Sequence, residues 1–350
     1  MTAPGGTRPG AAPPGSVPPG PAPKGSVWVP GGTFTMGSDA FYPEERPAHP
    51  VAVDGFWMDA HPVTVAEFRR FVRDTGYVTV AERVPQAGQY PGAAPELLVP
   101  GALVFRMTAG PVPLDDYRRW WDYVPGASWR RPEGPGSDLG GRDRHPVTQV
   151  AFEDALAYAV WAGRDLPTEA EWEFAARGGL DGATYVWGEE RDPRGKRMAN
   201  IWYGDFPWRL DTPSGRPGTT PVGRYPANGY GLFDMAGNVW EWTADPWTVR
   251  HPDPAPAACC APRNPRAEAA PTRSADGDAG GDGGEPGGFA RRTVKGGSHL
   301  CAASYCLRYR PAARQGESED TATSHLGFRT VLRPAPPAPS LSGRTALTLV

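Results

Sequence analysis

The stretch NGYGLFDMAGNVWEWTAD, residues 228–245, contains the features that decide the fold class of this chain. Glycines recur through its first half, which predicts a loop, and regular structure is expected only in the short strand-like run 239–242. The chain beyond residue 180 has the same character, with aromatic-rich loops and short strand-like pieces. We therefore expect a large irregular share in the second half of the molecule.

Three helices are expected upstream of that stretch. The first, residues 64–76, and the third, which begins at Thr168, each open with a capping box, in which a threonine is followed three residues later by a glutamate. The second is expected over residues 153–162 and ends at Gly163. These helices sit among short strands, so the fold class is α+β.

Short apolar runs predict the N-terminal strands. The runs 27–29 and 33–36 are separated by a Pro-Gly-Gly turn, which suggests that they form a hairpin. The runs 51–53 and 56–58 predict two further strands.

The composition excludes several classes of protein. The 350 residues include 36 Lys plus Arg against 39 Asp plus Glu, a formal charge of -3, whereas a nucleic-acid binder normally carries a basic excess. No run approaches the roughly 18 apolar residues that a membrane span needs. The N-terminus lacks the apolar segment of a secretory signal. We therefore expect a cytoplasmic protein with neither a nucleic-acid nor a membrane partner.

One ordered domain, residues 26–333, is expected to account for most of the chain. Residues 1–25 are rich in Gly and Pro and predict a disordered leader, and residues 334–350 predict a flexible tail. A low-complexity stretch at 252–288 predicts a solvated loop inserted into the domain.

The cysteines pose the first chemical question. Cys301 and Cys306 are five residues apart, a spacing that turns them away from each other on a helix and places them on opposite faces of a strand. They converge only if the backbone turns irregularly, and two converging thiolates favour Cu(I), or Zn(II) with further ligands. Two separate buried cysteines or an incidental disulfide are the alternatives, and spacing does not decide. Cys259 and Cys260, in the low-complexity stretch, are interpreted as exposed spare thiols.

The surroundings of the thiols add limited information. Arg308, Arg310 and Arg314 would lower the pKa of the thiols if their charges point inward. The six histidines show no H-x-H or H-E-x-x-H pairing, and no G-x-S-x-G elbow is present. A histidine-based metal centre and a serine hydrolase therefore both lack their usual signatures.

A second candidate site lies inside the opening stretch. Asp234 and Glu241 are seven residues apart with loop carbonyls between them, a pattern that suits a hard cation such as Ca(II). A loop held by ordinary hydrogen bonds is the alternative.

Longer motifs resemble a known family. The segment GGSHLCAASYCLRYRPAARQGESEDTATSHLGFR, residues 296–329, resembles the active-site segment of the formylglycine-generating enzymes, or sulfatase-modifying factors. LPTEAEWEFAARGGL at 166–180 and the opening stretch follow in the family's order, and the resemblance covers about residues 26–333. It implies the formylglycine-generating-enzyme fold, a C-type-lectin-like α+β domain with little regular structure.

The resemblance also implies an activity: copper-dependent, O2-consuming conversion of the cysteine in a sulfatase Cys-x-Pro-x-Arg motif to Cα-formylglycine. The substrate would be an unfolded or nascent sulfatase polypeptide. By resemblance, Cys301 and Cys306 are the Cu(I) ligands and Ser298 is the family's active-site serine. Trp240 matches an aromatic wall of the oxygen pocket, and Tyr305 lies between the two ligands.

Two calcium sites are implied in the same way. The second comprises Asp234, the carbonyls of Gly237 and Val239, and Glu241. The first comprises Asn200 and Ile201, while the family's aspartate aligns with Ser214 in a stretch where Asp211 is a possible substitute.

Two further points follow from the resemblance. The positions of the family's eukaryotic disulfides are occupied by residues other than cysteine, which indicates a bacterial-type cytoplasmic enzyme; they are Ala159, Ala176, Pro311 and Thr330. The alternative function is a non-catalytic peptide- or ligand-binding module on the same fold, whose known examples lack the paired thiols. An iron-dependent sulfoxide-forming oxidase would need a three-His motif that is not visible.

Overall fold

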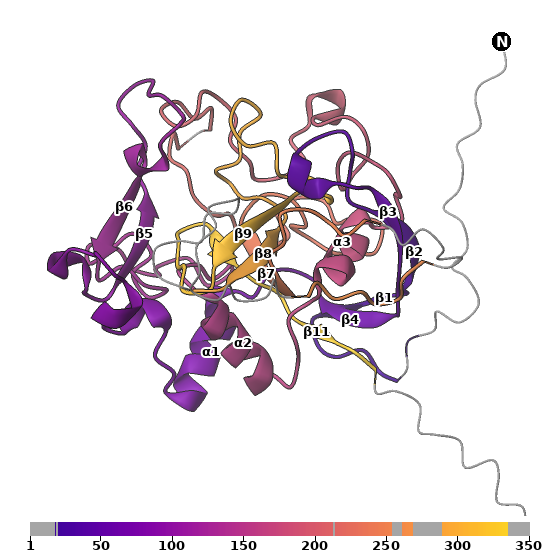
Figure 1. The fold of residues 1–350 in the computed structure, drawn as a ribbon, viewed down its shortest axis with the longest axis horizontal. Helices are drawn as coiled ribbons and strands as arrows, with labels where there is room; N and C mark the ends of the chain where they lie inside the picture. Colours follow the sequence, from indigo (N-terminus) through magenta and orange to yellow (C-terminus); the bar gives the residue numbers. More distant parts are fainter. Residues whose placement is uncertain (1–17, 19, 213, 254–260, 269–288, 335–350) are drawn as a thin grey trace, which may run out of the picture.

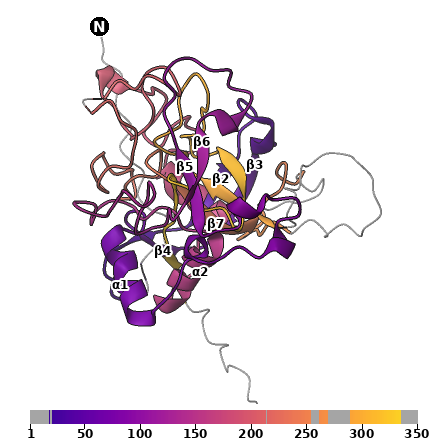
Figure 2. The same cartoon turned by 90° about the vertical axis from the view of Figure 1, so that its left-hand side faces the viewer.

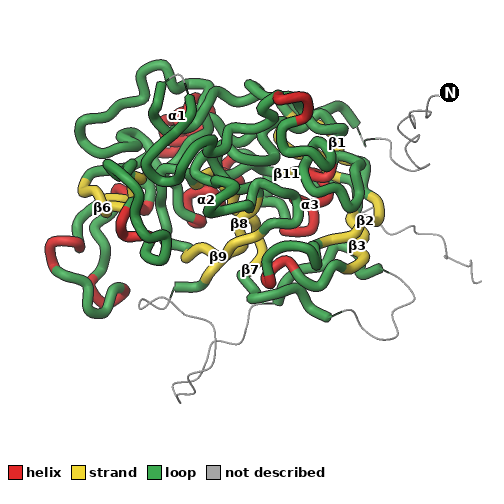
Figure 3. The backbone as a smooth tube through the Cα atoms, turned by 90° about the horizontal axis from the view of Figure 1, so that it is seen from above, coloured by secondary structure: helices red, strands yellow, loops and turns green. Residues whose placement is uncertain are grey.

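The computed structural model describes residues 18, 20–212, 214–253, 261–268 and 289–334 (Figure 1). Its α-helices are α1 (Val65–Thr75), α2 (Phe152–Trp161) and α3 (Glu169–Arg177). Its strands are β1 (Ser26–Val29), β2 (Gly32–Met36), β3 (His49–Val53), β4 (Phe56–Asp59), β5 (Gly101–Phe105), β6 (Trp121–Pro125), β7 (Trp240–Pro246), β8 (Arg291–Lys295), β9 (Arg314–Ser318), β10 (Leu326–Gly327) and β11 (Val331–Leu332). Short 3-10 helices span Pro43–Glu45, Val80–Glu82, Ala87–Gln89, Pro95–Leu97, Tyr117–Arg119 and Pro193–Gly195. Loops form most of the tube in Figure 3, so the expected α+β class with little regular structure is confirmed.

The helices begin and end where the sequence predicts. At the start of α1, the Thr64 backbone N–H donates to the Glu67 carboxylate at 2.8 Å, and the Glu67 N–H donates to the Thr64 hydroxyl. Gly76 ends α1 in the left-handed region, with φ of 70°. Thr168 caps α3 in the same way. Figure 2 shows α1 and α2 side by side. The Phe68 ring of α1 stacks on the Tyr158 ring of α2, with centroids 6.0 Å apart.

The expected N-terminal hairpin is wrong. β1 pairs with β4 and β2 pairs with β3, so the two apolar runs belong to different sheets. The turn between them explains the difference. A Cβ at Gly31 would lie 2.6 Å from the backbone of Asp54, because the turn packs closely against the β3–β4 connection and sends the chain from one sheet to the other.

A four-stranded sheet of order β10-β7-β8-β9 positions the loops that carry the chemistry. β8 and β9 are antiparallel, and the segment between them contains both cysteines of interest. β10 runs parallel to β7, and the Trp240 N–H donates to the His325 carbonyl at 2.9 Å. Three distant parts of the sequence therefore meet at one end of this sheet.

The core combines large aromatic side chains with fully buried ion pairs. The aromatic residues with at most 1% exposure include Trp129, Trp172, Trp242, Phe68 and Tyr309. The buried charged residues form hydrogen-bonded pairs across elements, such as Arg329 with Glu241. No helix in the described part of the chain is long and apolar enough to cross a membrane.

The expected leader, insertion and tail lie partly outside the described residues. Most of the leader at 1–25, the tail from 335 and Cys259 and Cys260 lie outside the described residues. Inside the expected 252–288 insertion, residues 261–268 are described, and they pack on β3. The Ala52 N–H donates to the Pro262 carbonyl at 2.9 Å, and Asn264 binds Asp54. This part of the insertion is therefore hydrogen-bonded to the domain, while most of its residues are exposed to solvent.

Candidate functional site

The two cysteines of the 296–329 segment converge. The Sγ atoms of Cys301 and Cys306 lie 2.9 Å apart, and both side chains are buried. The backbone turns back between them, because the Cys306 N–H donates to the Ala302 carbonyl at 2.7 Å. Both are free thiols, since a disulfide would bring the sulfurs to about 2.05 Å. The irregular turn that convergence requires is present, and the two thiols form one site.

A glycine makes this turn possible. Gly297 follows β8 with φ of 67°, and a Cβ there would lie 2.8 Å from the Arg308 carbonyl oxygen. Only glycine allows the chain that enters the thiol loop to pass so close to the chain that leaves it. The loop is thereby closed at its base.

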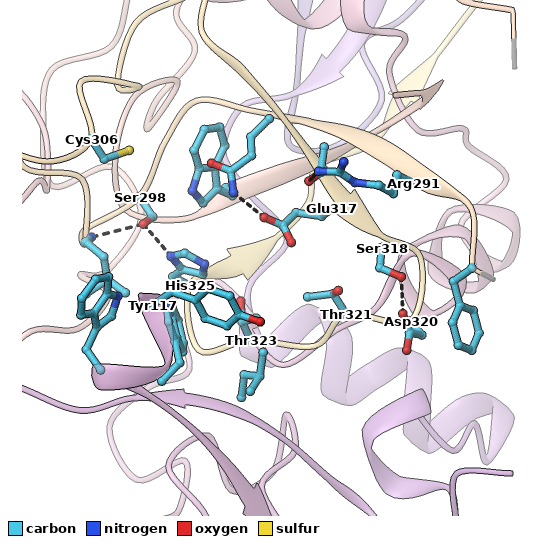
Figure 4. A pocket seen from close by; sticks show the side chains of 18 of the residues that line it. Tyr117, Arg291, Ser298, Cys306, Glu317, Ser318, Asp320, Thr321, Thr323 and His325 are labelled. Carbon is cyan, nitrogen blue, oxygen red and sulfur yellow. Dashed lines mark hydrogen bonds between the residues drawn. The ribbon is translucent and has the colours of Figure 1, made fainter. Parts of the chain in front are cut away.

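A cavity of about 710 Å³ opens onto the thiols. Its lining includes all five residues expected to be catalytic together with one that was not: Trp240, Ser298, Cys301, Tyr305, Cys306 and His325. In Figure 4, Cys306, Ser298 and His325 lie on one side of the pocket and Arg291, Ser318 and Asp320 on the other. A polypeptide side chain therefore has a route to the sulfurs.

The two thiols differ in their electrostatic surroundings. A hydrogen bond from Cys301 and the nearby Arg308 guanidinium lower the pKa of Cys306 to about 7. Burial raises the pKa of Cys301. Arg308 is held in place by Glu44, at 2.7 Å, and lies over the Tyr42 ring. Cys306 is therefore the more acidic thiol of the pair.

The other two arginines of the segment do not serve the thiols. Arg310 makes a two-bond ion pair with Glu45, and Arg314 makes one with Glu169. Both guanidinium groups are buried in structural pairs. The expectation that all three arginines lower the thiol pKa holds for Arg308 alone.

Ser298 links the thiols to a histidine that the sequence analysis did not identify as a site residue. Its backbone N–H points to the Cys301 sulfur at 3.5 Å, and its Oγ lies 3.0 Å from Nδ1 of His325. The Leu300 N–H also donates to this Oγ, at 3.2 Å. The sequence pattern did not indicate His325, because no second metal ligand lies near it at a characteristic spacing. Its contact with Ser298 instead depends on the pairing of β10 with β7.

Aromatic side chains form the rest of the wall near the thiols. Trp240, the first residue of β7, is buried and lines the cavity. Tyr305 is 38% exposed and stacks on Phe206, with ring centroids 4.5 Å apart, while Trp120 meets it edge-on. Both positions expected from the resemblance therefore face the cavity.

The residues expected for the second calcium site form a buried acidic pair. Burial raises the pKa of Asp234, and the neighbouring Glu241 carboxylate adds to the rise. Glu241 receives two bonds from Arg329 and one from Trp172, whereas Asp234 receives a backbone N–H from Gly223. The single Arg329 guanidinium compensates one of the two buried negative charges, and carboxylate oxygens are donors of the kind that a hard cation takes. The carbonyls of Gly237 and Val239 belong to the same loop.

The residues expected for the first calcium site fit less well. The Asn200 amide donates to the Gly218 carbonyl and to the Asn238 side chain, and Ile201 is buried. The Ser214 hydroxyl bonds within its own turn. Asp211 faces Arg209, with the carboxylate oxygen 3.9 Å from Nε. Neither Ser214 nor Asp211 is therefore placed as the acidic ligand, and the site does not fit a calcium ion.

The candidate metal sites among the described residues contain no more than two His, Cys, Asp or Glu side chains each. Within the described residues, no group of three or more His, Cys, Asp and Glu side chains is arranged to hold a metal ion. The pair of thiols is a two-ligand set, and two soft sulfur donors suit Cu(I). The thiol site therefore fits a copper ion by donor type.

Comparison with known proteins gives consistent matches. Residues 15–334 match the family model described as the sulfatase-modifying factor enzyme 1-like domain. The chain is 56% identical over 309 residues to a formylglycine-generating enzyme of Mycobacterium tuberculosis, covering 88% of this chain and 97% of the relative. It is 44% identical over 316 residues to that of Thermomonospora curvata, covering 89% and 94%.

Among solved structures, PvdO from Pseudomonas aeruginosa superposes with a TM-score of 0.52 at 22% identity, covering 87% of this chain and 93% of PvdO. At that identity the likeness concerns the fold alone.

Proposed function

Because this chain belongs to the sulfatase-modifying factor family, we propose that it oxidises a cysteine of a sulfatase polypeptide to Cα-formylglycine, in the motif Cys-x-Pro-x-Arg and with O2 as the oxidant. The observation that carries the proposal is the pair of free thiols, with Sγ atoms 2.9 Å apart, at the wall of a cavity that admits a peptide side chain. A purely binding module on the same fold has no need of such a pair.

We propose Cu(I) as the cofactor, held by Cys301 and Cys306. When held there, Cu(I) would supply activation of dioxygen and a coordination position for the substrate thiolate. The lowered pKa of Cys306 favours its thiolate form, which is the form that binds metal. Arg308 compensates the negative charge of that thiolate from its fixed position against Glu44.

The remaining residues of the site shape the reaction space. Ser298 lies next to Cys301, with its backbone N–H 3.5 Å from the sulfur, and its hydroxyl oxygen keeps a lone pair that can accept a hydrogen bond from a protonated oxygen species in the cavity. Trp240 and Tyr305 line the same cavity, where their rings would limit the access of water to a bound cysteine. These side chains hold and shield the reacting cysteine rather than carry electrons.

We propose that the substrate is an extended segment. The cavity runs from the thiols to the strand residues Gln315 and Ser318 of β9, so a cysteine must enter together with its flanking residues. A cysteine inside a folded sulfatase does not satisfy this demand, which supports an unfolded or nascent polypeptide as the partner.

We propose calcium at the second site only, with Asp234, Glu241 and the carbonyls of Gly237 and Val239 as ligands. We also propose a cytoplasmic location. Two thiols 2.9 Å apart stay reduced most readily in a reducing compartment, and the four positions at which eukaryotic relatives carry structural cysteines lack them here.

The test is a peptide assay. The full-length protein is reconstituted anaerobically with Cu(I), and a peptide bearing Cys-x-Pro-x-Arg is added with O2 and a thiol reductant. The expected product is an aldehyde that reacts with a hydroxylamine probe, and a peptide with Ser in place of Cys should give none. Binding of the peptide without aldehyde formation would favour the non-catalytic module instead.

A further inference from the structure

A histidine side chain forms part of the cavity wall beside the thiols. His325 lies just before β10, lines the cavity and is partly exposed to it. Its ring packs against Trp121, with centroids 4.8 Å apart, and its Nδ1 lies 3.0 Å from the Ser298 hydroxyl oxygen. Figure 4 shows the two side chains pointing toward each other on the Cys306 side of the pocket.

The protonation state of this ring follows from its surroundings. Burial lowers the pKa of His325 to about 3, so the imidazole is neutral at physiological pH. A neutral imidazole carries one N–H and one lone pair, and its two nitrogens therefore have opposite roles. Which nitrogen carries the proton depends on Ser298.

Ser298 decides the tautomer. Its side chain has no exposed surface, so the hydroxyl proton needs an acceptor inside the protein. The Leu300 N–H donates to this oxygen and is therefore no acceptor, whereas Nδ1 of His325 is within reach. The Ser298 hydroxyl thus donates to Nδ1, and the proton of the imidazole resides on Nε2.

We propose that His325 binds the substrate backbone: its Nε2–H, fixed by Ser298, donates a hydrogen bond to a peptide carbonyl adjacent to the reacting cysteine. This inference rests on the proposed function, because it requires a peptide in the cavity. A neutral N–H donor suits a neutral carbonyl oxygen, and every residue of an extended segment offers a backbone carbonyl oxygen.

The position supports this assignment. Ser298 contacts His325 through its hydroxyl and the Cys301 sulfur through its backbone N–H, so a single residue separates the imidazole from the thiol pair. A carbonyl held at Nε2 therefore belongs to a residue next to the cysteine that meets the sulfurs. The contact orients the peptide and takes no part in electron transfer, so His325 is a positioning residue for the reaction.

Two amide substitutions distinguish the roles of the two ring nitrogens. His325→Gln places an N–H near the position of Nε2 and removes the Nδ1 contact, while His325→Asn offers a partner to Ser298 but does not reach as far into the cavity. His325→Phe keeps the ring and removes both contacts.

The first measurement is binding, by fluorescence anisotropy, of a labelled Cys-x-Pro-x-Arg peptide with Ser in place of Cys. We expect Kd to rise about tenfold for His325→Phe and His325→Asn, the loss typical of one hydrogen bond, and less than about threefold for His325→Gln. In the aldehyde assay the same variants should raise KM more than they lower kcat.

A matched control exists elsewhere in the fold. His145 is also half-buried and also meets a hydroxyl through Nδ1, that of Thr219 at 2.9 Å, but it lies outside the lining of the cavity. His145→Phe should leave Kd and KM unchanged even if it lowers the melting temperature. A general effect of losing an imidazole–hydroxyl pair would appear in both variants.

The outcomes are distinct. If the wild-type protein forms no aldehyde, the proposed function fails regardless of these variants. If it forms aldehyde and His325→Phe binds the peptide as tightly as the wild type, the inference is overturned. Rescue by His325→Asn but not by His325→Gln would also overturn it, because the ring would then serve Ser298 alone.

Discussion

The ammonium group of Lys295 lies 3.0 Å from a carboxylate oxygen of Glu173, and neither side chain has any exposed surface. Lys295 is the last residue of β8, immediately before the glycine pair that leads into the thiol loop. Glu173 belongs to α3 and also accepts bonds from Arg177 and from the Gly37 N–H. The pair therefore joins the strand that carries the thiol loop to the helix behind it.

Removing one member of this pair should be strongly destabilising. Glu173→Gln removes the carboxylate charge and leaves the Glu169 carboxylate, 3.6 Å away, as the one charged partner of the buried Lys295 ammonium among the described residues. We expect the free energy of unfolding to fall by about 3–5 kcal/mol, as for other broken buried pairs, measured by urea denaturation. The matched control is Arg69→Ala, which breaks the exposed pair of Arg69 with Asp143 and should cost less than about 1 kcal/mol. Equal losses in the two variants would contradict a special role for the buried pair.

The thiol pair gives the sharpest catalytic prediction. Cys301→Ala and Cys306→Ala should each abolish aldehyde formation, because each variant keeps only one of the two proposed sulfur ligands. Both changes remove a single buried atom, so the melting temperature should fall only slightly. Copper bound per chain after anaerobic reconstitution and gel filtration provides a second readout, expected to fall to background in each variant. Retained turnover in both variants would refute the ligand assignment.

Local patterns in the sequence predict local structure well. The capping boxes at Thr64 and Thr168 fix where two helices begin, because both partners lie within four residues. The apolar runs of β1 and β2 predict strands but not their partners, since both strands pair with distant segments rather than with each other. Pairing of that kind depends on which faces pack together, and a short run does not encode it.

The sequence likewise indicates some residues of the candidate site and not others. Cys301 and Cys306 stand out as a pair, yet their spacing alone leaves convergence undecided, and the resemblance to a family supplied the assignment. His325 was missed because its partner Ser298 is 27 residues away in the sequence and reaches it through the sheet. A histidine gives a local signal only when a second ligand follows at a characteristic spacing.

A buried histidine should make part of the stability depend on pH. His251 is 4% exposed, and burial lowers its pKa to about 4, with Arg314 and Lys295 lowering it and Glu169 and Glu173 opposing them. The unfolded chain, with a histidine pKa near 6.5, therefore binds more protons than the folded chain between about pH 4 and 6.5. As the pH falls below 6.5, His251 therefore lowers the free energy of unfolding by about 1.4 kcal/mol per pH unit.

His251→Phe tests this dependence without breaking a hydrogen bond at Nε2, because that atom has no hydrogen-bond partner among the described residues. The variant should match the wild type within about 1 kcal/mol at pH 7.5 and gain about 2 kcal/mol relative to it at pH 5, measured by urea denaturation. Between pH 7.5 and 8.5 the difference should stay flat, which serves as the internal control. A difference that is constant down to pH 5 would show that His251 is protonated in the folded state.

The acidic pair of the opening stretch predicts stabilisation by calcium. A cation bound by Asp234 and Glu241 in the folded state alone raises the melting temperature with its concentration. We expect Ca²⁺ to raise the melting temperature of the chelator-treated protein, and Asp234→Ala to abolish this rise. Asp234→Asn keeps an oxygen ligand and should retain part of the effect. Asn200→Ala is the control at the first site, where Ser214 and Asp211 do not supply an acidic ligand, and it should leave the calcium response intact. If the response disappears with Asn200→Ala and survives Asp234→Ala, the ion binds at the first site, and the structural argument for the second is wrong.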